Sequence, residues 1–201
     1  MFPESRKQRT EYYQGLADAL GLPLDGKLSV TATRALPGAT ASPAPNPVPK
    51  PAPSVARPEP LPAPNTGDYK WSVCLHESGH IVGALATGGR VVRGVVTRRD
   101  GYAESFGTGS VHDRATVIYC GPLAQLLFGD GDCPFANGDA AGDMENLFAL
   151  NLRAAARADA RAEAERLVSL HRTAIGRIAN VLAARGFIDG PEAEAVYRAS
   201  L

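Results

Sequence analysis

The chain has 201 residues, of which 44% are hydrophobic and 21% are charged, and its formal net charge at pH 7 is zero. A neutral chain has no net electrostatic attraction to nucleic acids or anionic membranes, so we expect neither as a partner. No run of about 18 apolar residues occurs, and no apolar stretch follows the first residues, which predicts no membrane span and no signal peptide. The three cysteines (Cys74, Cys120 and Cys133) are too few for a disulfide framework, so we expect a reducing, cytoplasmic location.

The first 66 residues differ in composition from the rest of the chain. Apolar side chains recur at helical spacing near the start, at Tyr12, Tyr13, Leu16, Ala17 and Leu20. This spacing predicts a short helical module over residues 1–36, which could dock a partner. Residues 37–66 are rich in Pro and Ala and cannot bury a core, so we expect an extended tether there. Residues 67–201 have the length of one compact domain.

The segment from Tyr69 to Thr87 is predicted to be a buried helix, because apolar side chains cover most of its circumference. It contains the sequence His76-Glu77-Ser78-Gly79-His80. Residues four apart lie above one another on a helix, so His76 and His80 could direct ring nitrogens at one metal ion. Glu77 lies at the edge of the same face, where it could hold a metal-bound water.

Two histidines and a glutamate at this spacing are typical of zinc hydrolases. Zinc lowers the pKa of a bound water to about 7, and a carboxylate such as Glu77 can take its proton as the water attacks a carbonyl. Unpaired buried polar groups are costly, and one metal ion would satisfy all three side chains. Gly79 weakens a helix by about 1 kcal/mol relative to Ala, which indicates a close approach by another group. The alternative, a solvated polar stripe, is disfavoured by the apolar flanks.

The next segments predict a small β element and a further helix. Residues 91–97 read as a strand, which could bind a substrate backbone by strand addition if it lies at a sheet edge. Residues 98–109 predict a turn and a second strand. Asp113 is expected to cap a helix that runs to Leu127 and is broken or kinked at Gly121-Pro122. Residues 129–138 are rich in Gly and Asp, which predicts a loop.

The remainder of the chain is predicted to be helical. One amphipathic helix carries Leu147, Leu150 and Ala154. The core face of the next comprises Leu167, Leu170, Ala174, Ile175, Ile178, Val181 and Leu182. Gly186 is expected to end that helix, and Gly190-Pro191 to open a last one through Ala199. The predicted fold class is therefore α+β, mainly α-helical with a small β element.

A catalytic zinc ion needs a third protein ligand besides His76 and His80. His112, His171 and the three cysteines are candidates, although both histidines are better explained as surface residues. Acidic side chains at the start of the helix after Gly138 are further candidates: Asp139, Asp143 and Glu145. The residues alone leave this choice open.

Three segments in this order resemble the peptidase domain of FtsH, the AAA+ zinc protease: the helix around His76, the stretch Gly121–Gly129, and Ala140-Ala-Gly-Asp-Met144. The resemblance covers residues 69–199. It implies Zn²⁺ as the cofactor, the ligands His76, His80 and Asp143, and the general base Glu77. The chain departs from the family at three points: Gln125 replaces a glutamate, Asp139 replaces a glycine, and the stretch ending in Phe128-Gly129 is one residue shorter. Asp139 is therefore the alternative to Asp143.

The sequence contains no Gly-x-x-x-x-Gly-Lys-Ser/Thr phosphate loop, so we expect no ATPase activity of its own. These observations predict a zinc-dependent metalloendopeptidase that cleaves extended or unfolded protein segments. Two alternatives are a catalytically silent zinc protein that binds or regulates, and an adaptor that recruits a partner through residues 1–36. The related peptidase domains form hexameric rings, so a homo-oligomer is left open.

Overall fold

The computed structural model describes residues 69–98, 100–129, 134 and 140–201. The helices are α2 (Trp71–Ala86), α3 (Val111–Phe128), α5 (Ala141–Ala149), α6 (Ala154–Leu170), α7 (Arg172–Arg185) and α8 (Gly190–Arg198), and the strands are β1 (Arg90–Val96), β2 (Gly101–Phe106) and β3 (Phe187–Asp189). The described residues are mostly helical with one small antiparallel sheet, which agrees with the predicted α+β class. The predicted module over 1–36, the tether over 37–66 and most of the predicted loop over 129–138 lie outside the described residues.

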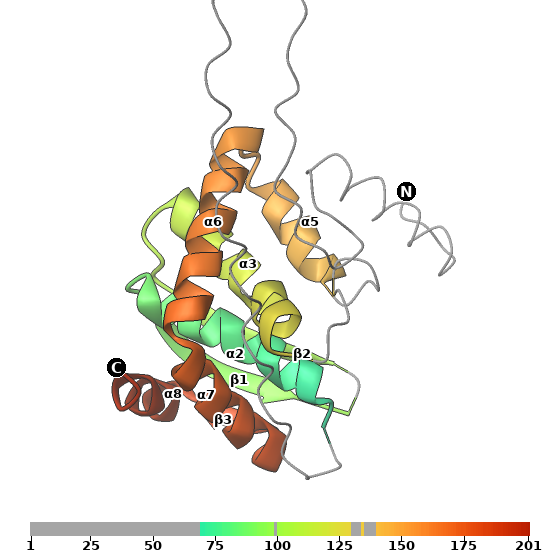
Figure 1. Cartoon of the computed structure of the whole chain (residues 1–201), viewed down its shortest axis with the longest axis vertical. Coiled ribbons are helices and arrows are strands. Elements are labelled where there is room, and N and C mark those ends of the chain that lie inside the picture. The colour runs from blue at the N-terminus through green and yellow to red at the C-terminus, as the bar shows by residue number, and fades with distance from the viewer. Residues whose placement is uncertain (1–68, 99, 130–133, 135–139) are drawn as a thin grey trace, which may run out of the picture.

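Helix α2 lies in the middle of the domain, as Figure 1 shows, and contacts α3, α6 and α7 as well as strands β1 and β2. From Cys74 to Ala84, every position except His80 is buried, and the buried residues include His76 and Glu77. The prediction of a buried helix from its all-round apolar composition is therefore confirmed. In the part of the chain that the structure describes, no helix combines the length and the apolar character needed to cross a membrane.

The sheet has the strand order β2-β1-β3, and both pairings are antiparallel. Gly94 lies opposite Ala103 on one side and Ile188 on the other. A β-carbon at Gly94 would come within 2.6 Å of Ile81 Cδ1 in α2, so this position faces α2. β1 is thus the central strand, and our expectation that it could lie at an edge was wrong. The three-residue strand β3, too short to recognise from its sequence, covers the edge of β1. Among the described strands, β2 pairs only with β1, so its other edge has no described partner strand.

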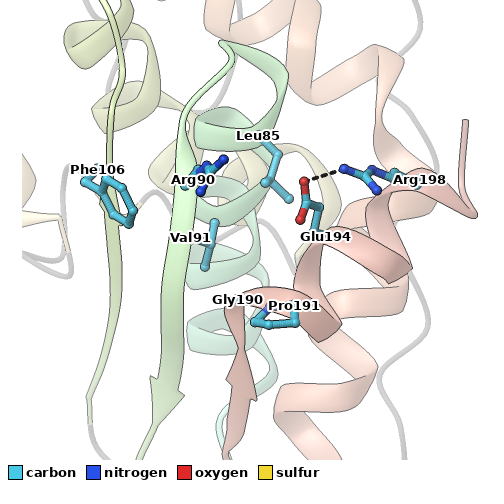
Figure 2. A pocket seen from close by; sticks show the side chains of 8 residues that line it. All are labelled: Leu85, Arg90, Val91, Phe106, Gly190, Pro191, Glu194 and Arg198. Carbon is cyan, nitrogen blue, oxygen red and sulfur yellow. Dashed lines mark hydrogen bonds and ion pairs between the residues drawn. The ribbon is translucent and has the colours of Figure 1, made fainter.

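A cavity of about 360 Å³ opens where α8 crosses the start of β1 (Figure 2). Leu85 contributes to it from the C-terminal end of α2, and Phe106 from the end of β2. Glu194 and Arg198 of α8 form an ion pair at its wall. None of the residues predicted to form the metal site lines this cavity.

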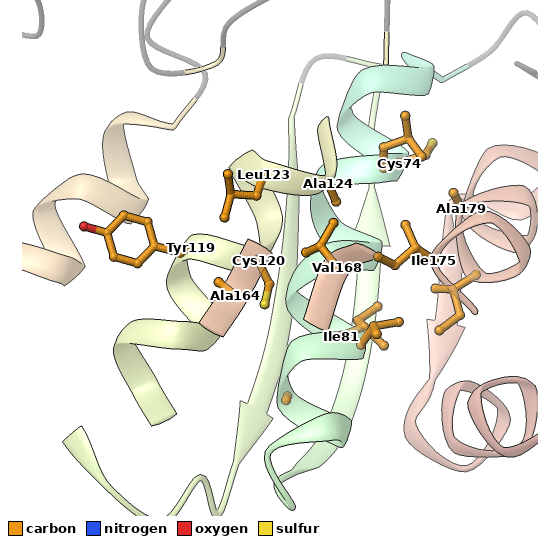
Figure 3. Packing of buried hydrophobic residues seen from close by; sticks show 14 of the residues in the cluster. Cys74, Ile81, Tyr119, Cys120, Leu123, Ala124, Ala164, Val168, Ile175 and Ala179 are labelled. Carbon is orange, nitrogen blue, oxygen red and sulfur yellow. The ribbon is translucent and has the colours of Figure 1, made fainter. Parts of the chain in front are cut away.

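Two glycines of α2 allow α3 to pack closely against it. A β-carbon at Gly83 would come within 2.8 Å of the Cys120 sulfur. A β-carbon at Gly79 would come even closer to the backbone of Cys120. The close approach predicted at Gly79 is therefore made by α3. Cys120, Leu123 and Ala124 of α3 continue into the core formed with α6 and α7, which Figure 3 shows.

Helix α3 differs from its prediction at both its start and its middle. Ser110 is the N-cap, and Asp113 completes a capping box by accepting from the Ser110 backbone, so Asp113 is not itself the cap. The helix runs unbroken from Val111 to Phe128 with Pro122 inside it. Proline removes one helical hydrogen bond. Here burial of α3 against α2 and α6 outweighs that loss.

The C-terminal helices are divided differently from the prediction. The predicted helix through Leu147 and Ala154 is two helices, α5 and α6, separated at Asn151, whose φ of 50° lies in the left-handed region. A second break at His171 separates α6 from α7 and leaves Leu170 64% exposed, so its assignment to the core was wrong. The predicted helix end at Gly186 and the last helix opened by Gly190-Pro191 are confirmed.

Candidate metal centre

His76 and His80 lie one turn apart on α2, on the side that faces α3 and α5. Their ring centroids are 4.8 Å apart with the ring planes at 71°. Asp143, in the first turn of α5, reaches both rings: its Oδ2 is 2.8 Å from His76 Nε2, and its Oδ1 is 3.2 Å from His80 Nε2. Each residue offers one ligand atom, and the three atoms lie within 4.8 Å of one another. The structure thus brings the three predicted ligands together.

The other candidates for the third ligand lie elsewhere. His112 is in the first turn of α3, and His171 lies between α6 and α7, with its Nε2 3.5 Å from the Tyr197 hydroxyl. Cys74 and Cys120 are buried in the core, where burial raises the pKa of each thiol to about 12. A thiol with such a pKa stays protonated and is a poor metal ligand. Glu145 is exposed on α5, whereas Asp139 and Cys133 lie outside the described residues.

The donor set is suited to a divalent metal ion such as Zn²⁺. Imidazole nitrogens and carboxylate oxygens are both ligands that this metal accepts in proteins. Gly121 of α3 contributes space, because a β-carbon there would come within 2.3 Å of His80 Nε2.

The ligand residues are electrostatically coupled. Burial would raise the pKa of Asp143, but the charge of His80 and hydrogen bonds from both imidazoles hold that pKa well below its usual range. Burial would lower the pKa of His80, but the charge and hydrogen bond of Asp143 outweigh it and raise the pKa to about 9. Asp143 is therefore ionised throughout the neutral range, as a metal-ligating carboxylate must be.

Glu77 lies between the ligand pair and the start of β2. Its side chain is buried, and burial raises its pKa above the ordinary value, although the nearby histidines oppose this effect. A β-carbon at Gly101, the first residue of β2, would come within 2.8 Å of Glu77 Cγ and 3.0 Å of its Oε1. The Glu77 carboxylate thus lies against the first residue of β2, the strand that among the described residues pairs only with β1.

Helix α3 supplies two contacts to the histidines that the sequence reasoning missed. The carbonyl oxygen of Val117 accepts a hydrogen bond of 2.9 Å from His80 Nδ1. A second bond of 2.9 Å joins His76 Nδ1 to Oε1 of Gln125. The contact with a backbone carbonyl could not be predicted from the sequence, because every residue has one. The contact of Gln125 could have been suspected, because a lone polar residue between apolar neighbours on a buried helix needs a hydrogen-bond partner.

No protein-family model matches the chain, and no curated protein matches its sequence significantly. The chemistry of the centre therefore rests on its own residues: a His76/His80/Asp143 group that could hold a metal ion, with a buried carboxylate beside it.

Proposed function

We propose that the chain is a zinc-dependent metalloendopeptidase that hydrolyses peptide bonds in extended or unfolded protein segments. The observation that carries the proposal is the convergence of His76, His80 and Asp143, with ligand atoms within 4.8 Å of one another, beside the buried Glu77. A structural zinc site is normally closed by four protein ligands. Among the residues that the structure describes, this group has three, which is the number that leaves a position for a reacting molecule.

His76, His80 and Asp143 would hold the zinc ion, which would supply Lewis acidity toward the carbonyl group and the attacking water. Glu77 then acts as the general base. It takes a proton from the attacking water and delivers it to the departing amine of the cleaved peptide bond. Its burial matters, because proton transfer is most efficient when the pKa of the base lies near the working pH, and burial moves the pKa of Glu77 upward.

Strand β2 supports an extended peptide as the substrate. Within the described part of the chain this strand pairs with β1 on one side only, and it begins at Gly101, directly beside Glu77. Unpaired backbone groups at a sheet edge are a template for an added strand. A peptide paired there would have its backbone close to the general base. The sequence contains no phosphate loop, so the proposal is restricted to segments that are already extended or unfolded.

Replacement of Glu77 by Gln tests the proposal. The amide keeps the shape of the side chain but cannot take a proton. We expect Glu77→Gln to keep one zinc per chain, measured by atomic absorption, and to cleave an unfolded casein-like substrate about 10²–10⁴-fold more slowly. Unchanged cleavage would exclude Glu77 as the base. A wild type that binds zinc but cleaves nothing would instead favour the silent zinc protein.

A further inference from the structure

We infer that Gln125 is a positioning residue for the metal: its side-chain carbonyl fixes the tautomer and the orientation of His76, so that Nε2 is the nitrogen that binds zinc. The inference rests on the proposed zinc site. It adds a residue that touches neither the metal nor the substrate and acts through His76 alone.

The first step of the argument is the direction of the hydrogen bond. Oε1 of Gln125 lies 2.9 Å from His76 Nδ1, and a carbonyl oxygen can only accept. Gln125 therefore holds a proton on Nδ1 of His76. Nε2 is also the atom that faces Asp143, at 2.8 Å. Without a metal ion, Nε2 donates to this carboxylate; an ion at the site would replace the proton on Nε2, whereas Gln125 keeps the proton on Nδ1.

The second step is burial. Gln125 is only 3% exposed and His76 only 7% exposed, so bulk water has little access to replace this bond. A buried donor whose partner is removed stays unsatisfied, which disfavours the tautomer that carries it. The alternative tautomer has its proton on Nε2 and cannot bind zinc through that atom.

The third step is the comparison between the two histidines. His80 Nδ1 donates to the Val117 carbonyl, which is part of the backbone of α3 and cannot be removed by a side-chain substitution. His76 relies on a side chain at the corresponding ring nitrogen. The two supports come from the same helix, eight residues apart in sequence. A single substitution of Gln125 can therefore remove the hydrogen bond that orients His76 and leave the one that orients His80 intact.

The experiment compares three variants with the wild type. Gln125→Met keeps a similar length but offers no carbonyl, whereas Gln125→Glu keeps an acceptor. Thr116→Val is the matched control, because Thr116 is also a buried polar residue of α3 and its hydroxyl bonds the His112 carbonyl, away from the ligands. Zinc affinity is measured by competition with a chelator, and circular dichroism of the metal-free proteins verifies that each variant is folded.

We expect Gln125→Met to bind zinc about 10–100-fold more weakly than the wild type, and Thr116→Val to bind it normally. Gln125→Glu should bind zinc at least as tightly as the wild type. In nitrogen-15 spectra of the imidazoles, the slowly exchanging Nδ1 proton of zinc-loaded His76 should persist in Gln125→Glu and disappear in Gln125→Met.

Zinc binding by Gln125→Met within about 3-fold of the wild type would overturn the inference, since losses for such residues are about 10–100-fold. Equal losses in Gln125→Met and Gln125→Glu would also overturn it, because packing and not hydrogen-bond acceptance would then be responsible. These outcomes are separate from a failure of the proposed peptidase activity, which would appear as a zinc-loaded wild type without cleavage. A wild type that binds no zinc would overturn both.

Discussion

The carbonyl oxygen of Cys120 in α3 lies so close to Gly79 in α2 that a β-carbon at residue 79 would come within 2.3 Å of it. This contact sets the separation of the helix that carries the metal ligands from the helix that supports them. Both hydrogen bonds from α3 to the histidines depend on that separation. Gly79, which lies between His76 and His80, is therefore required for close helix packing, although glycine is unfavourable inside a helix.

Gly79→Ala is expected to destabilise the protein and weaken the metal site together. Backbone cannot rotate away from the added methyl group, so α2 and α3 must move apart, which typically costs about 1–3 kcal/mol. The measurement is chemical denaturation of the metal-free protein, followed by zinc titration. Gly142→Ala in α5 is the control, because a β-carbon there meets nothing within 4 Å. Equal stability of Gly79→Ala and the wild type would contradict the close packing.

Gly101→Ala is expected to lower peptide cleavage without loss of zinc. The new β-carbon would come within 2.8 Å of Glu77 Cγ, so the buried carboxylate must shift away from its position. A misplaced base lowers kcat, and a shift of about 1 Å can cost about 10²-fold. Gly109→Ala is the control, since its β-carbon meets only Asp113 Oδ2 at 3.6 Å, an ordinary contact. Parallel losses of zinc and activity in Gly101→Ala would indicate general damage to the site.

The metal-free protein is expected to be most stable at mildly acidic pH. The lowered pKa of Asp143 gives stability above its unfolded value of about 3.9 that is lost as the pH falls. The raised pKa of His80 gives stability below about 6.5 that is lost as the pH rises toward about 9. Glu77, whose pKa is also raised, adds to the loss at higher pH.

Denaturation in the presence of a chelator at pH 5, 7 and 9 measures this dependence. We expect the free energy of unfolding to fall by on the order of 1–3 kcal/mol between pH 5 and 9. Asp143→Asn should make the curve flatter, because the amide removes the charge that raises the pKa of His80. A metal-free wild type that gains stability above pH 6.5 would refute the coupling. Zinc should shift the optimum upward, since it requires neutral imidazoles.

Asp143→Ala is expected to release zinc and to loosen α5. Zinc affinity should fall by more than about 100-fold, because the loss of a direct ligand exceeds that of a supporting residue. α5 is short, and its buried residues are Met144 and Leu147. A bond from Asp143 to the metal would therefore contribute much of its attachment to α2. Hydrogen exchange over residues 141–149 should therefore accelerate in Asp143→Ala, and likewise in the chelated wild type.

Asp139→Ala is the control for this prediction, and it should retain zinc. Zinc retained by Asp143→Ala and lost by Asp139→Ala would move the third ligand to the alternative that the sequence left open. Unchanged exchange over α5 on chelation would show that its position does not depend on the metal.

Much of the centre could be predicted because its chemistry is local in sequence. His76, Glu77 and His80 share one helix, and the apolar surroundings of that helix predicted its burial. The closing contacts could not be predicted: Gln125 lies 49 residues from His76 and was noticed only as a departure from a family pattern. The continuity of α3 through Pro122 and the breaks at Asn151 and His171 depend on tertiary packing, which overrides local propensity. Likewise the central position of β1 depends on the brief strand β3.

The order of the ligands along the chain has a consequence for biosynthesis. Asp143 follows His76 by 67 residues, so at about 5–20 residues per second it is made about 3–13 s later. A nascent chain that has completed α2 holds two imidazoles but no carboxylate to close the centre. The complete set exists only after the ribosome has added α5. The candidate metal centre therefore cannot be completed on the nascent chain before α5, and α6 and α7, which also pack against α2, are made later still.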